Sequence, residues 1–442
     1  VIVKWEVLSH GLKENEGLEK VSDWERAAGY YYHDGTTLKE MIEKRPDRVN
    51  NGLFKRPPAA FLMKNGLGVK IELDSTSDYQ VKELSEGKFA LFQGQEEVED
   101  IYFIHPKRQA TEEPRTSRGT PISNLVGSLR QCFRIAPVRH CEYFNTGEQC
   151  RFCNYNATFQ DSRAIGLEVP TTILADETLE AYKLRAANVR FIEGRLVMGA
   201  ITNSDLEVNT HLQFIVRLAK ATPYLPNITL TTQPMSRANM LRLKDAGVSC
   251  VTMNMEVWDP QLFPVVCPGK AKHRGRERYL EAYQEAVEVF GWGHTGTNLP
   301  PGATLMPENG HKTWQEARDS QIDGIRWLIQ HGAFPMWTSF RLGAGSVFGD
   351  IKANREKLPP TDYVLDIGLA HHQACTEYGM YDRMNKLMYC PMDCLSTTYA
   401  GEIGILERAG DVPSWAADAL PAEATWLADF VKSVNPRATT VQ

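Results

Sequence analysis

Strand-like and helix-like segments alternate through the middle of the chain, from about residue 125 to residue 341. The strand-like runs are short and apolar, and the segments between them have the length and polarity of helices that cover a sheet. Strands are predicted at Leu129–Val138, Val189–Gly199, Ile228–Thr232, Ser249–Met255, 293–305 and Phe334–Phe340, and helices at Asp176–Ala187, Leu206–Ala221, Ser236–Gly247, Glu277–Phe290 and Thr313–Gln330. This alternation predicts an α/β fold with a parallel sheet and right-handed crossovers, of the partial (β/α)6 TIM-like barrel type.

The two ends of the chain have a different pattern. Polar stretches at Leu18–Ala28 and Thr37–Lys44 predict helices, and short β-like runs separated by turn residues fill 60–105. After residue 341 the chain is mixed, with predicted helices at Thr361–Lys386 and Ala416–Val431. We therefore expect three parts: a β-rich N-terminal extension (1–120), the barrel core (121–345) and a C-terminal extension (346–442).

Composition narrows the functional classes. The chain has 442 residues and a formal net charge of −6, which gives no reason to expect nucleic acid or an anionic membrane as partner. No apolar run has the length of a membrane span, and the first thirty residues lack the apolar core of a signal peptide. Nine cysteines, six of them in two clusters, indicate metal binding in a reducing compartment, so a cytoplasmic location is expected.

The first cysteine cluster consists of Cys141, Cys150 and Cys153, with the spacing C-x8-C-x2-C. Three thiolates leave one position of a tetrahedral site open, which suits a metal centre that performs chemistry. The spacing is compatible with a [4Fe–4S] cluster that has one free iron, with a structural zinc site completed by a residue such as His140, or with unligated thiols. Because the cluster follows the first predicted strand, it is expected at the C-terminal rim of the barrel, where such folds carry their chemistry.

A second cysteine cluster lies near the C-terminus and consists of Cys375, Cys390 and Cys394. Its spacing is compatible with an auxiliary iron–sulfur cluster, and Cys390 precedes a proline, as cluster ligands often do. The alternative is a set of buried free thiols, since cysteine is often simply a small core residue.

The cysteine loop on the first strand of a β/α barrel resembles the radical S-adenosylmethionine (SAM) superfamily, and several further stretches resemble its biotin-synthase-like branch. Phe152 stands where that family carries an aromatic residue next to the adenine, and Met198-Gly199-Ala200 resembles the backbone stretch that meets the SAM amino group. Asn254 and Glu256 match a pair that contacts the SAM ribose and carboxylate, and Arg276 is favoured as a partner of that carboxylate. The first gap differs from the usual C-x3-C-x2-C motif by five residues.

The resemblance implies a radical SAM enzyme that uses a [4Fe–4S] cluster to cleave SAM reductively into methionine and a 5′-deoxyadenosyl radical. A small-molecule substrate is implied, with sulfur insertion, rearrangement or C–C cleavage as the reaction, and so is an electron donor of the flavodoxin or ferredoxin type. The alternative from another class is a zinc-stabilised binding protein on a barrel scaffold. The sequence leaves the residues that contact the substrate unassigned.

Overall fold

The structure is a computed structural model of the 442-residue chain. It describes residues 2–25, 37–50, 53–58, 60–63, 68–103, 113–129, 132–164, 170–187, 191, 193–222 and 227–383. The predicted helix Ala416–Val431 and the cysteines Cys390 and Cys394 lie outside the described residues.

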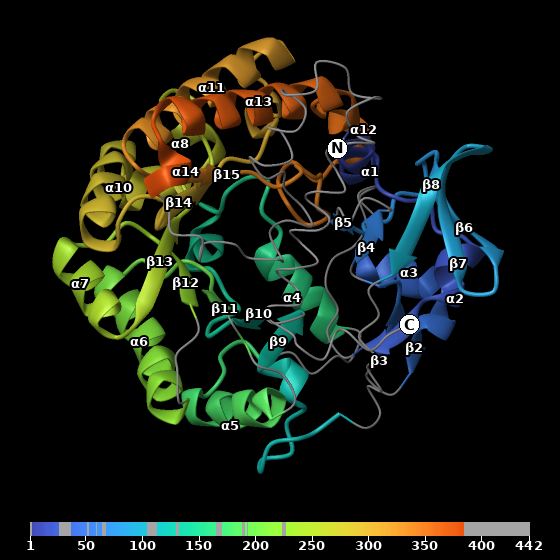
Figure 1. Ribbon diagram of the computed structural model, residues 1–442, viewed down its shortest axis with the longest axis horizontal. Helices are drawn as coiled ribbons and strands as arrows, with labels where there is room; N and C mark the ends of the chain where they lie inside the picture. The colour runs from blue at the N-terminus through green and yellow to red at the C-terminus, as the bar shows by residue number, and fades with distance from the viewer. Residues whose placement is uncertain are drawn as a thin grey trace.

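A seven-stranded sheet forms the centre of the molecule, in the order β15-β14-β13-β12-β11-β10-β9. Its six parallel strands are β10 (Cys132–Ile135), β11 (Glu193–Val197), β12 (Asn227–Thr232), β13 (Val248–Met253), β14 (Thr295–Asn298) and β15 (Phe334–Met336). The predicted α/β fold with a parallel sheet is thus confirmed. The strands curve into an open barrel with helices on its outer side (Figure 1).

Helices on the outer side connect successive strands of this sheet, as the alternation of the sequence predicts. They are α5 (Ala175–Ala186), α6 (Ser204–Ala221), α7 (Arg237–Asp245), α10 (Arg276–Phe290) and α11 (Trp314–Gln330). Local signals set their ends: Ser236 caps α7 through the Asn239 N–H, and Thr313 with Glu316 forms a capping box on α11. The C-terminal ends of the strands therefore share one edge, where the loops meet.

Several elements of the barrel escape the sequence prediction. β9 (Val126–Leu129) pairs antiparallel with β10, so the predicted strand Leu129–Val138 covers one real strand and the end of another. The helix α4 (Tyr155–Ala164) follows the cysteine loop, and α8 (Phe263–Val266) and α9 (Pro268–His273) follow β13. Short 3₁₀ turns occur at η2 (Ile122–Asn124), η3 (Glu142–Thr146) and η4 (Ala303–Leu305).

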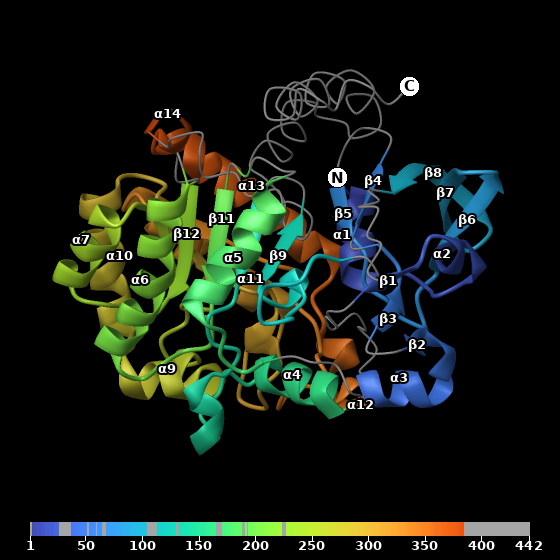
Figure 2. The same ribbon diagram turned by 90° about the horizontal axis from the view of Figure 1, so that it is seen from below.

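The N-terminal segment carries two small antiparallel sheets beside the open side of the barrel (Figures 1 and 2). One holds β1 (Asp23–Glu25), β2 (Val49–Asn50) and β3 (Leu53–Arg56), and the other β4 (Ala60–Met63), β5 (Gly68–Lys70), β6 (Tyr79–Ser85), β7 (Lys88–Gln93) and β8 (Glu96–Phe103). Its helical parts are α1 (Ile2–His10), α2 (Glu16–Lys20), α3 (Leu38–Lys44) and η1 (Pro46–Arg48). The predicted helix Leu18–Ala28 is wrong beyond Lys20, because Asp23–Glu25 pairs with β3 instead.

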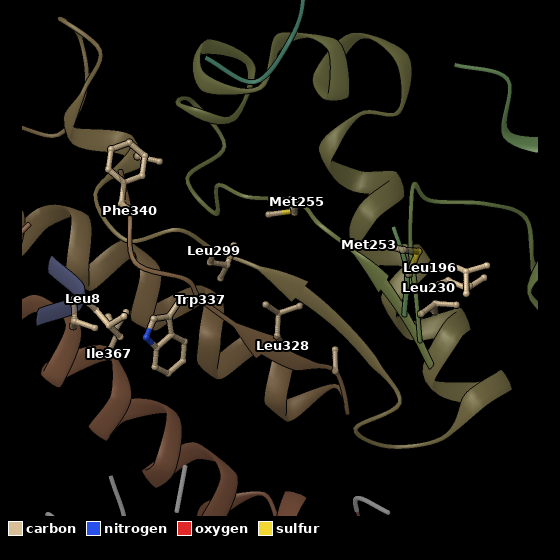
Figure 3. Close-up of a cluster of buried hydrophobic side chains, with 14 of the residues drawn as sticks. Leu8, Leu196, Leu230, Met253, Met255, Leu299, Leu328, Trp337, Phe340 and Ile367 are labelled. Atoms are coloured by element: carbon tan, nitrogen blue, oxygen red, sulfur yellow. The ribbon is translucent and has the colours of Figure 1, made fainter. Parts of the chain in front are cut away.

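The described part of the C-terminal extension is helical. It contains α12 (Ile351–Asn354), η5 (Arg355–Lys357), α13 (Thr361–Glu377) and α14 (Met380–Arg383). Leu8 of α1 and Ile367 of α13 lie close to Trp337 in one buried cluster, so the two ends of the described chain meet beside β15 (Figure 3). No helix in the described part of the chain is long and apolar enough to cross a membrane.

Two fully buried histidines predict how stability depends on pH. Burial lowers the pKa of His211 and of His371 to about 4, from a usual value of 6.5. Between pH 4 and pH 6.5 the unfolded chain therefore binds more protons than the folded chain. The free energy of unfolding is highest above pH 6.5 and decreases as the pH falls towards 4. Between pH 7.5 and 5.0 we expect each histidine to cost about 2 kcal/mol of unfolding free energy. Urea unfolding should show this loss, and His371→Gln should reduce it relative to wild type. An equal loss in both proteins would contradict the assignment of His371.

Candidate functional site

The cysteine loop follows β10 and reaches the C-terminal edge of the barrel, as predicted. The backbone N–H of Cys141 donates to Oδ1 of Asn156 on α4 at 2.9 Å, and the N–H of Glu142 donates to Ala200 O at 2.9 Å. The Cys153 N–H donates to Cys150 O at 2.9 Å, which closes the C-x2-C turn. The loop is therefore fixed to the helix that follows it and to the end of the neighbouring strand.

The eight-residue gap forms a docking segment on α8 and α9. Within the gap, Glu148 O accepts from the Gly269 N–H at 2.8 Å, and just beyond it the Arg151 N–H donates to Val266 O at 2.9 Å. A Cβ at Gly269 would stand 2.6 Å from that same Glu148 oxygen, so only glycine permits this approach. The ring of Tyr143 stacks on His273 with 5.4 Å between the ring centroids. The extra residues thus attach the loop to the segment that follows β13.

Glu148 strengthens this attachment electrostatically. Its carboxylate contacts Lys272 Nζ and, at 3.0 Å, His273 Nε2. The hydrogen bonds from Lys272 and His273 lower the pKa of Glu148 to about 2, so the carboxylate stays charged at neutral pH. The loop is held to α9 by charge as well as by backbone hydrogen bonds.

The three predicted ligands lie within electrostatic range of one another. Burial raises the pKa of the Cys141 and Cys153 thiols, and Cys150 acts on both of them. A hydrogen bond from Cys267, which lies between α8 and α9, lowers the pKa of Cys150. Within the described residues, no three His, Cys, Asp or Glu side chains are gathered closely enough to hold a single metal ion.

The end of β11 packs directly against the cysteine loop. Gly199 donates its N–H to Val138 O at 3.2 Å, and a Cβ at Gly199 would stand 2.1 Å from His140 O. Glycine is therefore required here, since any side chain would push the strand end away from Cys141. The predicted SAM-contacting stretch Met198-Gly199-Ala200 is beside the cysteine loop for this reason.

A buried ion pair stands at the end of β13. Lys270 Nζ contacts Glu256 Oε1 at 2.9 Å and Asn254 O at 2.5 Å. Burial lowers the pKa of Lys270, but the charges of Glu256 and Cys150 outweigh it and raise that pKa well above its usual range. Glu256 adopts a φ of 74°, the left-handed region that non-glycine residues rarely occupy. Such backbone strain is typical of functional sites, where the surrounding contacts maintain it.

Asn298 at the end of β14 completes this group. Its backbone N–H donates to Oδ1 of Asn254 at 3.1 Å, and its Nδ2 donates to Glu256 Oε2 at 3.4 Å. Its own Oδ1 is buried and has no hydrogen-bond partner among the described residues. A buried acceptor of this kind calls for a donor, which a ligand or an ordered water can supply.

The other predicted site residues lie as follows. Phe152 packs edge-on against Phe340, with 6.1 Å between the ring centroids. Arg276 contacts Trp258 and Glu277 at the start of α10, whereas Lys270 holds the position beside Glu256. His140 Nδ1 lies 3.0 Å from Asn156 Nδ2. Cys375 is buried on α13 with its Sγ 3.6 Å from His371 Nδ1, and its predicted co-ligands Cys390 and Cys394 lie outside the described residues.

Three residues of this site are absent from the sequence prediction: Lys270, Asn298 and Cys267. Lys270 stands in a run of basic residues (Lys270, Lys272, His273, Arg274) that reads as a solvated helix end. Only the fold shows that Lys270 points inward, with a side chain that is 7% exposed. Asn298 carries a sequence signal, since a polar residue at the end of a buried strand of such a sheet is a site candidate.

The donors present fit an iron–sulfur cluster with SAM. Three thiols occupy one loop, and the backbone of Gly199 and Ala200 lies against that loop. An acidic and a basic side chain, Glu256 and Lys270, stand near Cys150, and the free Oδ1 of Asn298 lies beside them. SAM carries an ammonium, a carboxylate and two ribose hydroxyls, which are the groups that such side chains bind.

The chain is an α/β protein: an open barrel of six parallel strands that carries a loop with three thiols at its C-terminal edge. No protein-family model matches the chain. It is similar to the bacteriochlorophyllide c C-7(1)-hydroxylase of Chlorobaculum limnaeum, with 27% identity over 239 residues, covering 50% of this chain and 55% of the relative. The chain thus spans about half the length of this curated relative. The relative confirms the predicted resemblance to the radical SAM superfamily.

Among solved structures, the chain is similar to methylornithine synthase PylB, with 15% identity and a TM-score of 0.40 over 56% of this chain and 63% of that one. The hydrogenase maturase HydG of Carboxydothermus hydrogenoformans has 17% identity and a TM-score of 0.39, over 58% of this chain and 54% of that one.

Proposed function

We propose that this chain is a radical SAM enzyme that acts on a small-molecule substrate. The observation that carries the proposal is the three-thiol loop of Cys141, Cys150 and Cys153, which lies at the C-terminal edge of the parallel sheet and is packed against Gly199 and Ala200. When bound there, a [4Fe–4S] cluster and SAM, with one electron from an external donor, would supply radical chemistry that removes a hydrogen atom from the substrate.

In this proposal the chain's own residues bind and orient. Cys141, Cys150 and Cys153 would hold three irons of the cluster, and the backbone of Gly199 and Ala200, which lies against the cysteine loop, would bind the SAM amino group. Asn254 and Glu256 bind the ribose and carboxylate region, while Lys270 keeps Glu256 in its strained conformation through their contact at 2.9 Å. Phe152, beside Phe340, offers an aromatic face to the adenine.

Reconstitution of the chain with iron and sulfide under anaerobic conditions tests the proposal. We expect about four irons per chain and an absorbance band at about 400 nm. Addition of SAM and a strong reductant should yield 5′-deoxyadenosine. A colourless protein with one bound zinc and no SAM cleavage would support the zinc-stabilised binding protein instead. An iron count of about eight would indicate the second cluster at Cys375, Cys390 and Cys394.

The substrate and the electron donor belong to the proposal as well. The curated relative is named as a hydroxylase of a bacteriochlorophyllide, a small organic molecule. For this chain we propose only that the substrate is a small molecule and that the electron donor is of the flavodoxin or ferredoxin type.

A further inference from the structure

The side chain of Asn156 binds the backbone of Cys141 on both sides of the residue. Asn156 lies in the first turn of α4 and is 5% exposed. Its Oδ1 accepts the Cys141 N–H at 2.9 Å, and its Nδ2 donates to Cys141 O at 3.3 Å and lies 3.0 Å from His140 Nδ1. Because a backbone N–H can only donate, the amide oxygen must face it, and Nδ2 is then directed at the carbonyl. One buried side chain therefore contacts both polar backbone groups of Cys141.

The residues on either side of Cys141 are anchored as well. The hydroxyl of Tyr155 on α4 donates to Val138 O at 3.2 Å, three residues before Cys141. On the other side, Glu142 Oε2 accepts the Thr202 N–H at 2.7 Å and the Thr202 hydroxyl at 2.6 Å, beyond the end of β11. The first cysteine is thus held by α4 and by the segment after β11, both of which are outside the eight-residue gap.

The contacts of the gap lie at its far end. Glu148 is bonded to Gly269, and Arg151 donates its Nε to Val265 O at 2.7 Å, so these contacts fix the part of the loop next to Cys150. Between this part and Cys141, residues 145–147 are exposed, and Gly147 turns the chain with a φ of 69°. An exposed turn of this kind opens more easily than a buried segment. It therefore fixes the distance between Cys141 and Cys150 less firmly than buried hydrogen bonds do.

A shorter path through the chain joins Cys141 to the other two cysteines. Asn156 follows Cys153 by three residues, whereas Cys150 follows Cys141 by nine. The Cys153 N–H donates to Cys150 O at 2.9 Å, so the C-x2-C turn and the start of α4 form one compact unit. The amide of Asn156 connects this unit directly to Cys141.

We propose that Asn156 is the positioning residue that brings Cys141 to the metal centre held by Cys150 and Cys153. This inference rests on the proposed function and explains how its site tolerates the C-x8-C spacing. Asn156 acts through the backbone of Cys141 and supplies no ligand itself. Because the position of Cys141 then depends on α4, the length of the gap is free to vary, and its residues serve to dock the loop on α8 and α9.

Alkylation of the metal-free protein with iodoacetamide, followed by mass spectrometry of each cysteine, tests the contact itself. We expect Asn156→Ala to raise the rate constant of Cys141 by about tenfold, because two hydrogen bonds that hold its backbone are lost. The rate constants of Cys150 and Cys153 should stay near those of wild type. Asn239→Ala is the matched control, since Asn239 is 4% exposed and lies in the first turn of α7, and it should change none of the three.

Iron release to a chelator from the reconstituted protein tests the consequence for the metal centre. We expect Asn156→Ala to release iron about tenfold faster than wild type. In the presence of iodoacetamide, Cys141 should be alkylated before Cys150 and Cys153. A residue that only stabilises the fold would expose all three cysteines together, and the melting temperature of the metal-free variant reports that effect separately.

Two results would overturn the proposal. Unchanged alkylation of Cys141 in metal-free Asn156→Ala would show that other contacts hold this cysteine. Unchanged iron release in Asn156→Ala, in a protein that loses its iron in Cys141→Ala, would show that the gap positions the ligand. A wild-type chain that retains no iron refutes the proposed function instead, and the metal-free alkylation still decides whether Asn156 positions Cys141.

Discussion

Alanine at Cys153 should abolish both the cluster and SAM cleavage. Cys153 lies on the closed C-x2-C turn, where its thiol is in electrostatic range of Cys150 and Cys141. A [4Fe–4S] cluster with one open iron needs three thiolates, so loss of one leaves too few ligands to retain it. We expect the iron content of Cys153→Ala to fall from about four per chain to near zero. The 5′-deoxyadenosine signal should fall to that of a protein-free mixture.

The same result is expected for Cys150→Ala and for Cys141→Ala, and the last is the sharpest case. Cys141 is separated from the other two cysteines by the eight-residue gap, so full loss in Cys141→Ala would show that it is a ligand despite the unusual spacing. Cys250→Ala is the matched control, because this thiol is buried on β13 and should leave the iron content unchanged. An active, iron-loaded Cys141→Ala would refute the ligand set and point to Cys132, which is buried on β10.

The sequence predicts the barrel well because its signals are local. Each apolar run is followed by a helix of ordinary length, and caps such as Ser236 and Thr313 mark where the helices begin. The strand Asp23–Glu25 was not predicted, because the partner that makes it a strand, β3, lies about thirty residues later in the chain. β9 was not predicted as a separate strand, because β9 and β10 follow each other closely in the sequence and together form one nearly continuous β-like run.

Some residues of the candidate site could be predicted from the sequence and others could not. The cysteine spacing can be read directly from the sequence, and so can Gly199, Asn254 and Glu256, which stand at the ends of predicted strands. The docking of Glu148 on Gly269 joins residues more than a hundred positions apart, so no local pattern contains it. The pairing of β10 with β11 likewise depends on strand register, which the spacing of residues alone leaves open.

Methionine at Lys270 should weaken SAM binding while leaving the cluster in place. Lys270 and Glu256 form a nearly buried pair, with side chains 7% and 10% exposed. Removal of the cation leaves a buried carboxylate without its partner, at a cost of about 3–5 kcal/mol in stability. It also frees Glu256 from its left-handed conformation, so the ribose and carboxylate contacts lose their geometry. We expect the Kd for SAM, measured by calorimetry, to rise by about thirtyfold or more.

A double-mutant cycle separates the two effects of Lys270→Met. Glu256→Gln in the same chain removes the unpaired charge, so stability in urea should largely return, since the cost comes from the uncompensated carboxylate. SAM affinity should stay low, because neither charged group is restored. Lys220→Met, at an exposed position in the last turn of α6, controls for the loss of a lysine and should keep wild-type SAM affinity. If Lys270→Met binds SAM like wild type, Lys270 supports only the fold and Glu256 binds without its help.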